Sequence, residues 1–338
     1  MNYPKITIIT PSYNQGQYLE ETILSVINQN YPNLEYFVVD GGSTDNSVDI
    51  IQKYADKIAW WISEKDNGQT HAINKGLARA TGEIINWINS DDLLSEKSLF
   101  EVAAAFNDPN IMCLCGPITM FREEKRWSYP AAFARGETMQ SVFGRDSFNQ
   151  PGTYYRREAV ARIGLPDTRL NYVMDKEWFL RYLLLYGTSN IAVTDFSLAL
   201  YRFHDQTKTV ADATKFFDEY AALVYRVAEQ ANQPLLQKLI AQKYKCISHV
   251  YRLPNDLPKS TPELAHQMTA LLLLRRFDRI YDQADFDFAL QLNAAIRWDV
   301  LELDTELSQR ATTLRSAAKL RSWFWFRVAR KMGLAGRY

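Results

Sequence analysis

The sequence predicts an α/β fold in which helices flank a mixed, mostly parallel sheet, followed by a helical C-terminal extension. Across residues 1–100, short apolar and β-branched runs alternate with segments of helical periodicity, which is typical of strand–helix units in parallel sheets. Beyond residue 210, apolar residues recur at helical spacing and prolines separate the segments. We therefore expect two domains, residues 1–210 and residues 211–338.

Four apolar runs in the first domain predict buried strands, because strands of a covered parallel sheet are apolar on both faces. Turn-forming residues such as Pro11 and Gly41 end the runs, and amphipathic segments follow. The expected strands are residues 5–10, 34–39, 58–62 and 83–88, and the expected helices are residues 17–29, 48–54, 69–80 and 175–186.

Helical periodicity also covers most of the second domain. Thr261 followed by Pro262 predicts a helix start, since a hydroxyl caps the first turn and proline is tolerated at the first helical position. The expected helices are residues 216–230, 235–252, 261–277 and 286 to the end.

Composition narrows the class of protein. With 47% hydrophobic residues in 338, the chain can bury a core of ordinary size. Lys+Arg and Asp+Glu both number 39, so overall charge argues against a nucleic-acid partner. Three cysteines without paired spacing predict reduced thiols. The apolar runs are too short for a signal-peptide core or a membrane span, so we expect a cytoplasmic location.

Acidic residues follow two of the expected strands. Asp40 ends the second strand, and Asp91 and Asp92 follow the fourth. Ligands of open α/β sheets bind beyond the carboxyl ends of the strands. Carboxylates there can accept hydrogen bonds from ribose or hold a hard divalent cation whose other ligands are phosphate oxygens. The alternative is that these residues only form turns and helix caps. Because acidic residues follow two strands of the same α/β unit, a ligand site is favoured.

A series of short motifs resembles the N-terminal signature of family 2 inverting glycosyltransferases, which have the Rossmann-like GT-A fold. The resemblance covers about the first two thirds of the chain and implies a nucleotide-sugar donor (UDP-linked by preference), a saccharide or lipid-linked saccharide acceptor, and Mn²⁺ or Mg²⁺ as cofactor. We therefore expect the chain to act in the synthesis of a surface or extracellular polysaccharide. The motifs are Thr10-Pro-Ser-Tyr-Asn14, Asp40-Gly-Gly-Ser-Thr-Asp45, Asp66-Asn-Gly-Gln69, Asn74-Lys-Gly76, Gly82-Glu83 and Asn89-Ser-Asp-Asp92.

The resemblance also implies roles for residues in these motifs. Asp91 would bind the ribose and Asp92 the metal ion, although the family usually has Asp-x-Asp where this chain has Ser90-Asp91-Asp92, so the division of roles between the two aspartates stays open. The remaining substrate-binding residues would be Thr10, Pro11, Tyr13 and Asp40 at the base, and Asn74 and Lys75 at the diphosphate.

Two later segments extend the resemblance. Residues 174–181 resemble the family segment whose second acid is the catalytic base, which makes Asp175 the base and Glu177 a further substrate-binding acid. Tyr201-Arg-Phe-His204 resembles a segment in which a histidine reaches the metal ion or the phosphates. The alternatives are first-turn acids that complement a helix dipole, and a histidine at the surface or in packing.

The end of the chain combines aromatic residues with cations. Residues 319–331 contain Trp323, Phe324, Trp325 and Phe326 among arginines and lysines. This composition predicts peripheral docking at a lipid headgroup boundary, at the inner face of the cell membrane. The alternative is a helix whose aromatic side chains pack on the transferase domain or on a second copy of the chain.

Two other functions are compatible with an acidic site on an α/β sheet. A sugar-nucleotide nucleotidyltransferase would have a glycine-rich phosphate loop after the first strand, where this chain has Pro11-Ser-Tyr-Asn14. A non-catalytic scaffold of the same fold would be expected to lack Asp92 or Asp175, and both are present.

Overall fold

The computed structural model describes residues 3–145, 148–204, 207, 213–244, 253–254, 256–275 and 282–320. The chain divides into two compact units. The first comprises Met1–Gly136 and Ser147–Ala211, and the second comprises Glu137–Asp146 and Asp212–Tyr338.

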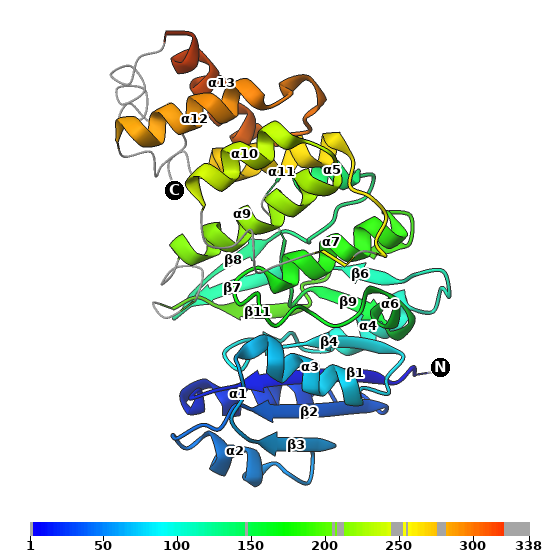
Figure 1. Ribbon diagram of the computed structural model, residues 1–338. Coiled ribbons are helices and arrows are strands. Elements are labelled where there is room, and N and C mark those ends of the chain that lie inside the picture. The colour runs from blue at the N-terminus through cyan, green and yellow to red at the C-terminus, as the bar shows by residue number, and fades with distance from the viewer. Residues whose placement is uncertain are drawn as a thin grey trace. The chain divides into compact units, whose positions relative to one another are not determined.

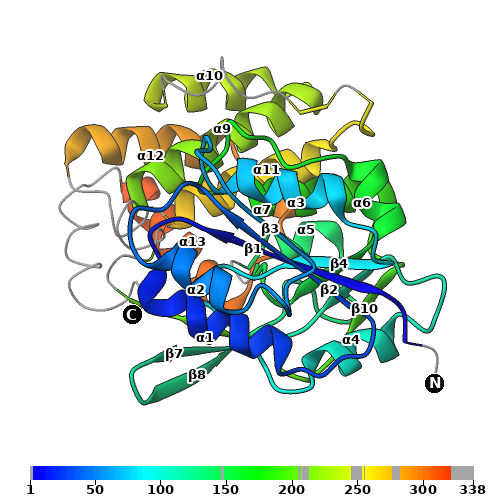
Figure 2. The same cartoon turned by 90° about the horizontal axis from the view of Figure 1, so that it is seen from below.

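The first unit is built on a seven-stranded sheet with the order β10-β6-β9-β4-β1-β2-β3. Figure 1 shows the order from β6 to β3, and β10 is labelled in Figure 2. β1 pairs in parallel with β2 and β4, β2 with β3, and β10 with β6, whereas β9 is antiparallel to β4 and β6. The expected mixed, mostly parallel sheet is therefore confirmed. The strands are β1 (Ile6–Ser12), β2 (Leu34–Asp40), β3 (Trp60–Ser63), β4 (Ile84–Trp87), β6 (Cys113–Cys115), β9 (Thr153–Arg156) and β10 (Ile191–Val193).

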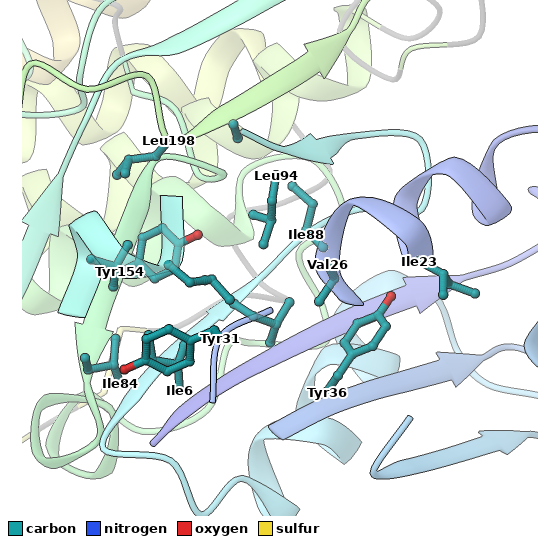
Figure 3. Close-up of a cluster of buried hydrophobic side chains, with 14 of the residues drawn as sticks. Ile6, Ile23, Val26, Tyr31, Tyr36, Ile84, Ile88, Leu94, Tyr154 and Leu198 are labelled. Carbon is teal, nitrogen blue, oxygen red and sulfur yellow. The ribbon is translucent and has the colours of Figure 1, made fainter. Parts of the chain in front are cut away.

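Helices cover both faces of this sheet (Figure 2). Ile6 and Ile8 of β1 join a buried cluster with Leu19 and Ile23 of α1 (Figure 3), while Ile9 points to the other face, where it lies against Gly76 of α3. This alternation is what period-2 strands buried on both faces require. The helices are α1 (Gly16–Ile27), α2 (Ser47–Lys53), α3 (Gln69–Arg79), α4 (Ser98–Ala105), α6 (Arg157–Ile163) and α7 (Met174–Tyr186).

β1 extends two residues beyond the strand expected from the sequence. Pro11 and Ser12 pair with Val39 and Asp40 of β2, whereas β4 pairs with β1 only as far as Ile9. At Pro11 the strand is therefore paired on one side, where a proline without an N–H is tolerated. The extension carries the end of β1 into the region where the candidate site lies.

A second sheet of four strands, ordered β5-β11-β7-β8, adds to the first unit. β11 runs parallel to β7 and antiparallel to β5, and β7 and β8 form an antiparallel hairpin (Figure 2). Its strands are β5 (Leu93–Leu94), β7 (Ile118–Arg122), β8 (Lys125–Tyr129) and β11 (Ala199–Arg202). β5 follows Asp91 and Asp92 directly, so the pairing of β5 with β11 brings residues 199–204 to the acidic loop.

The second unit is helical in its described residues. The Thr261 hydroxyl accepts a hydrogen bond from the Leu264 N–H (3.2 Å), which confirms the expected helix start. The single helix expected from residue 286 onward is wrong: α12 ends at Ala295, and Asp304 caps a new helix by accepting a hydrogen bond from the Leu307 N–H (2.7 Å). The helices are α5 (Met139–Val142), α9 (Ala213–Gln230), α10 (Pro234–Lys243), α11 (Pro262–Arg275), α12 (Gln283–Ala295), η2 (Trp298–Val300) and α13 (Thr305–Leu320).

None of the helices within the described ranges has the length and apolar character needed to span a bilayer. The aromatic residues of the segment 319–331 lie outside the described residues.

Candidate functional site

A cavity of about 660 Å³ opens at the carboxyl ends of the parallel strands of the first unit. The loops after β1, β2, β3 and β4 line it together with the end of β11, and its volume suits a small-molecule ligand. The lining residues are Pro11, Ser12, Tyr13, Gln15, Gly41, Gly42, Lys65, Asp66, Gly68, Gln69, Ala72, Asn89, Ser90, Asp91, Tyr201, His204 and Thr207.

Asp91 and His204 meet at this cavity although they lie far apart in the sequence. Asp91 Oδ2 is 3.1 Å from His204 Nε2, and the Tyr18 ring lies 5.2 Å from the imidazole. Both side chains are partly exposed. The structure thus brings together two of the residues predicted to bind substrate or metal.

The donor atoms of this pair fit a divalent cation. A carboxylate oxygen and an imidazole nitrogen are ligands that Mn²⁺ accepts, and a separation of 3.1 Å allows both atoms to bind one ion. In the part of the chain that the structure describes, no group of three or more acidic, histidine or cysteine side chains is arranged to hold a metal. Phosphate oxygens and water would therefore have to complete the coordination, as is usual where a metal binds together with phosphates.

Asp92 has a different environment from Asp91. Its side chain is buried, and Oδ1 accepts a hydrogen bond from the Arg202 N–H (3.0 Å) while Oδ2 accepts one from Asn89 Nδ2 (3.2 Å). Burial, and then the charge of Asp91, raise the pKa of Asp92 well above its usual value, and the Arg202 N–H opposes this shift only in part. The structure therefore turns Asp91 toward the cavity and Asp92 toward β11.

Asp40 lies behind the cavity wall. Its fully buried carboxylate accepts hydrogen bonds from the N–H groups of Gly42 (3.0 Å) and Ser43 (2.9 Å) and from the hydroxyls of Ser43 (2.5 Å) and Ser63 (2.7 Å). Gly42 has a φ of +82°, a backbone conformation that favours glycine. Asp40 thus fixes the turn whose glycines line the cavity, and its own oxygens face that turn.

The three residues predicted to line the base after β1 separate into two environments. Pro11 and Tyr13 line the cavity, and Tyr13 is 60% exposed. Thr10 is buried, with Oγ1 3.0 Å from the Tyr36 hydroxyl in the sheet interior. The cavity begins at Pro11, at the end of β1, whereas Thr10 lies one residue deeper in the sheet.

Asn74 and Lys75 lie on α3 away from the cavity lining. Asn74 Nδ2 donates a hydrogen bond to the Pro166 carbonyl (2.9 Å), and Lys75 forms an ion pair with Glu64 (2.8 Å). In this structure both side chains connect α3 to neighbouring segments.

Asp175 and Glu177 occupy the first turn of α7 but not the same environment. Asp175 is partly exposed, and its Oδ1 accepts a hydrogen bond from the Lys176 N–H (2.8 Å). Glu177 is fully buried and pairs with Arg181 at 2.7 Å. Arg181 also donates to the carbonyls of Ile163 and Leu165. Arg181 therefore connects α7 to the end of α6, and the Glu177 carboxylate pairs with its buried charge.

Asp175 does not line the 660 Å³ cavity, but the segment before it lies beside the cavity wall. Thr70 Oγ1 donates a hydrogen bond to the Leu170 carbonyl (2.8 Å), and the Asn171 side chain lies against Gly68. Gly68 has a φ of +106° and is the residue immediately before α3. The start of α7 is thus attached to the loop that forms one wall.

Several lining residues had no predicted role. Asp66 Oδ1 accepts a hydrogen bond from the Gly68 N–H (2.8 Å), and Gln69 Nε2 donates to Asn89 Oδ1 (2.7 Å). The Asp66-Asn-Gly-Gln69 motif signals this loop, but its sequence does not show which atoms face the ligand. Ser12 is 4% exposed, and within the described residues its hydroxyl has no hydrogen-bond partner. That hydroxyl is available to a ligand.

Residues 7–164 match the model of a family described as "Glycosyl transferase family 2". Among curated proteins, an uncharacterized glycosyltransferase of Haemophilus influenzae is 40% identical over 102 residues, and the putative teichuronic acid biosynthesis glycosyltransferase TuaG of Bacillus subtilis is 40% identical over 92 residues. These matches cover 29% and 26% of this chain, and 41% and 36% of the respective relatives. An uncharacterized glycosyltransferase of Rickettsia typhi is 26% identical over 233 aligned residues, and this match covers 65% of this chain and 70% of the relative.

Solved structures show the same fold at low sequence identity. TarS residues 1–349 from S. aureus, in complex with UDP-GlcNAc, align with a TM-score of 0.55 over 99% of this chain and 93% of that chain, at 17% identity. The mannosyltransferase PcManGT from Pyrobaculum calidifontis, in complex with GDP-Man and Mn²⁺, aligns with a TM-score of 0.53 over 98% and 84%, also at 17% identity. The expected GT-A fold is therefore confirmed.

Proposed function

We propose that this chain transfers a sugar from a nucleoside diphosphate sugar to a hydroxyl of a saccharide or lipid-linked saccharide, with inversion at the anomeric carbon. The match of residues 7–164 to the glycosyl transferase family 2 model supports this proposal. A role in surface polysaccharide synthesis is supported by the likeness to TuaG, whose name refers to teichuronic acid biosynthesis.

The observation that supports this proposal most directly is the Asp91–His204 pair at the carboxyl end of the sheet. A nucleoside diphosphate leaves with negative charge on its phosphates, and an enzyme lowers the barrier by placing positive charge where that charge develops. Asp91 and His204 would hold Mn²⁺ or Mg²⁺ there, and the cation would supply this charge when bound. The proposal moves the predicted metal ligand from Asp92 to Asp91, because Asp92 is buried against β11.

Asp175 is the proposed catalytic base. It would take the proton of the acceptor hydroxyl as that oxygen forms a bond to the anomeric carbon and the bond from this carbon to the diphosphate oxygen breaks. A single displacement of this kind inverts the configuration. Support comes from the partial exposure of Asp175 at the start of α7, next to the segment that contacts Thr70 of α3 and Gly68 in the cavity wall.

The wall formed after β1 and β2 is the proposed site of the nucleobase. Pro11 and Tyr13 offer apolar surface, and the Ser12 hydroxyl offers a hydrogen bond. A uridine donor is the first candidate because TarS was solved with UDP-GlcNAc. Guanosine donors should be tested beside it, because PcManGT was solved with GDP-Man.

A donor screen tests this function. The full chain is incubated with UDP-, GDP- and dTDP-linked sugars, with and without Mn²⁺, and release of the nucleoside diphosphate is measured. We expect cation-dependent release from one base class, and a higher unfolding temperature with that donor plus Mn²⁺. Asp91→Asn should lose both effects, whereas Asp56→Asn, which changes an exposed carboxylate outside the cavity, should keep them. Release that is equal in the wild type and in Asp91→Asn would reject the proposed role of the pair.

A further inference from the structure

Asp91 and Asp92 are neighbours in the sequence, yet their side chains point to different places. Arg202 bonds to both residues. Its backbone N–H donates to Asp92 Oδ1 (3.0 Å), and its side-chain Nε donates to the Asp91 carbonyl (3.0 Å). Arg202 therefore binds the side chain of Asp92 and the main chain of Asp91. The Asp91 carboxylate is left to face the cavity.

Helix α1 holds the same loop from its other side. Thr22 Oγ1 lies 2.9 Å from the Ser90 carbonyl and 2.8 Å from the Asp92 carbonyl, and Arg202 Nη2 donates to Glu21 (2.6 Å). The Glu21 side chain is 61% exposed, so this ion pair contributes little energy. The bond from Arg202 Nε to the Asp91 carbonyl matters more, because the Arg202 side chain is only 16% exposed.

Aromatic rings also connect Arg202 to His204. The Arg202 guanidinium lies 4.6 Å from the centre of the Phe121 ring and 4.8 Å from the centre of the Tyr18 ring. The Tyr18 ring in turn lies 5.2 Å from the His204 ring, whose Nε2 reaches Asp91. The Tyr18 ring therefore lies near both the Arg202 guanidinium and the His204 imidazole.

From these contacts we infer that the Arg202 side chain is a positioning group, which fixes the Asp91 main chain and holds the His204 imidazole at Asp91, while the Arg202 backbone N–H keeps the Asp92 carboxylate turned toward β11. Arg202 does not line the cavity, so it acts through the two residues that do. The consequence for cation binding rests on the function proposed above, whereas the consequence for the geometry of the pair does not.

Arginine has properties here that lysine lacks. The planar guanidinium donates to the Asp91 carbonyl and to Glu21 at the same time, and it also lies near two aromatic rings. A lysine ammonium is a compact point charge, which lacks this planar fork of donors and cannot stack on a ring. Arg202→Lys should therefore restore only part of what Arg202→Ala removes.

Arg156 provides a matched control in the same unit. It donates to the backbone carbonyls of Ile111 (2.8 Å), Phe106 (3.0 Å) and Asp108 (3.0 Å), and its guanidinium lies 5.2 Å from the Phe106 ring. Arg156 pairs with Ile84 at the start of β4, whereas Asp91 follows the end of that strand. Arg156→Ala thus removes similar contacts at the opposite end of the sheet.

The experiment uses NMR of the full chain labelled with ¹³C-histidine, in which four histidines are present and His204→Gln assigns the resonance of interest. The first readout is the Cε1–H shift of His204 without ligand. The second is the Mn²⁺ concentration that half-broadens this resonance in the presence of UDP. Unfolding temperatures of all variants are measured in parallel.

We expect Arg202→Ala to shift the His204 resonance and to raise the half-broadening Mn²⁺ concentration about tenfold, which corresponds to the loss of one hydrogen bond in a shielded site. Arg202→Lys should raise it less, and Arg156→Ala should lower the unfolding temperature while leaving both readouts unchanged. An unchanged His204 shift in both Arg202 variants would overturn the positioning role. Failure of Mn²⁺ to broaden His204 in the wild type would instead reject the cation site, and the ligand-free shift would still decide the role of Arg202.

Discussion

The two ends of the same parallel strands carry carboxylates in opposite situations. At the amino end, Glu35 of β2 accepts hydrogen bonds from the hydroxyls of Thr7 (2.6 Å) and Thr81 (2.6 Å) and from the Thr81 N–H (2.8 Å), and pairs with Lys5 (2.8 Å). Burial alone would raise the pKa of Glu35, but these donors outweigh it and lower the pKa to about 2. At the carboxyl end, burial and the Asp91 charge raise the pKa of Asp92.

This difference separates structural carboxylates from functional ones within a single sheet. Every donor that Glu35 needs comes from the chain, so its charge stabilises the fold. Asp91 faces a cavity beside His204, and its charge adds to the cost of burying Asp92. An arrangement that costs stability and opens onto a cavity is typical of a ligand site.

The largest expected effect concerns the proposed base near the carboxyl end. Asp175→Asn should lower the turnover number for sugar transfer by about 10³-fold, because an amide cannot accept the acceptor proton. Donor affinity should stay within about twofold of the wild type, since Asp175 does not line the cavity. Steady-state kinetics with the donor found in the screen measures both quantities. Turnover within a factor of ten of the wild type would remove Asp175 as the base.

The next effect distinguishes the two neighbouring aspartates. Asp91→Asn should lower kcat/KM by about 10²-fold, because it removes a charged ligand of the cation. Asp92→Asn should lower it less, since the asparagine Oδ1 can still accept the Arg202 N–H. The measurement is kcat/KM at saturating Mn²⁺ for both variants. A larger loss in Asp92→Asn would restore the assignment made from the family resemblance.

At the amino end the expected effect is on stability. Glu35→Gln should lower the free energy of unfolding of the first unit by about 2 kcal/mol at pH 7. Since the folded pKa of Glu35 lies below its usual value, this stabilisation is present above about pH 4.5 and is lost as the pH falls toward 2. Urea titrations at pH 7 and pH 3 should show the difference between wild type and variant shrinking at the lower pH. A difference that does not depend on pH would contradict the assigned pKa.

The smallest expected effect is a gain in stability, and it concerns Asp92 at the carboxyl end of the sheet. Since the folded pKa of Asp92 is raised, the wild type loses stability as the pH rises from the unfolded pKa through the folded one. Asp92→Asn removes this loss and should raise the free energy of unfolding by about 1 kcal/mol at pH 8, with little change at pH 4. Thermal unfolding at the two pH values measures it. Equal stability of the wild type and the variant at pH 8 would show that Asp92 carries no such cost.

Periodicity was enough to predict the strands that carry the site. The pattern of β-branched and apolar residues is local, so residues 34–39 and 83–88 correspond closely to β2 and β4. The family motifs also identified the loop of Asp91 and the segment of His204, which the structure brings together.

The orientation of side chains within those loops was not predictable in the same way. The Asp92 carboxylate is held away from the cavity by the backbone N–H of Arg202, more than a hundred residues further along the chain. Likewise, Asp40 turns inward because Ser63 of β3 donates to it, and Glu177 is buried because Arg181 connects it to the end of α6. These side-chain orientations arise from tertiary hydrogen bonds, which neither the composition nor the spacing of the sequence reveals.

The most direct test of the difference between the two ends is calorimetric titration of UDP into the full chain, with and without Mn²⁺, for the wild type, Asp91→Asn and Glu35→Gln. If the carboxyl end holds the cation and diphosphate together, Mn²⁺ should tighten UDP binding at least about tenfold in the wild type and in Glu35→Gln, and should have no effect in Asp91→Asn. Equal tightening in Asp91→Asn would contradict the account, since it would place the cation somewhere other than the Asp91–His204 pair.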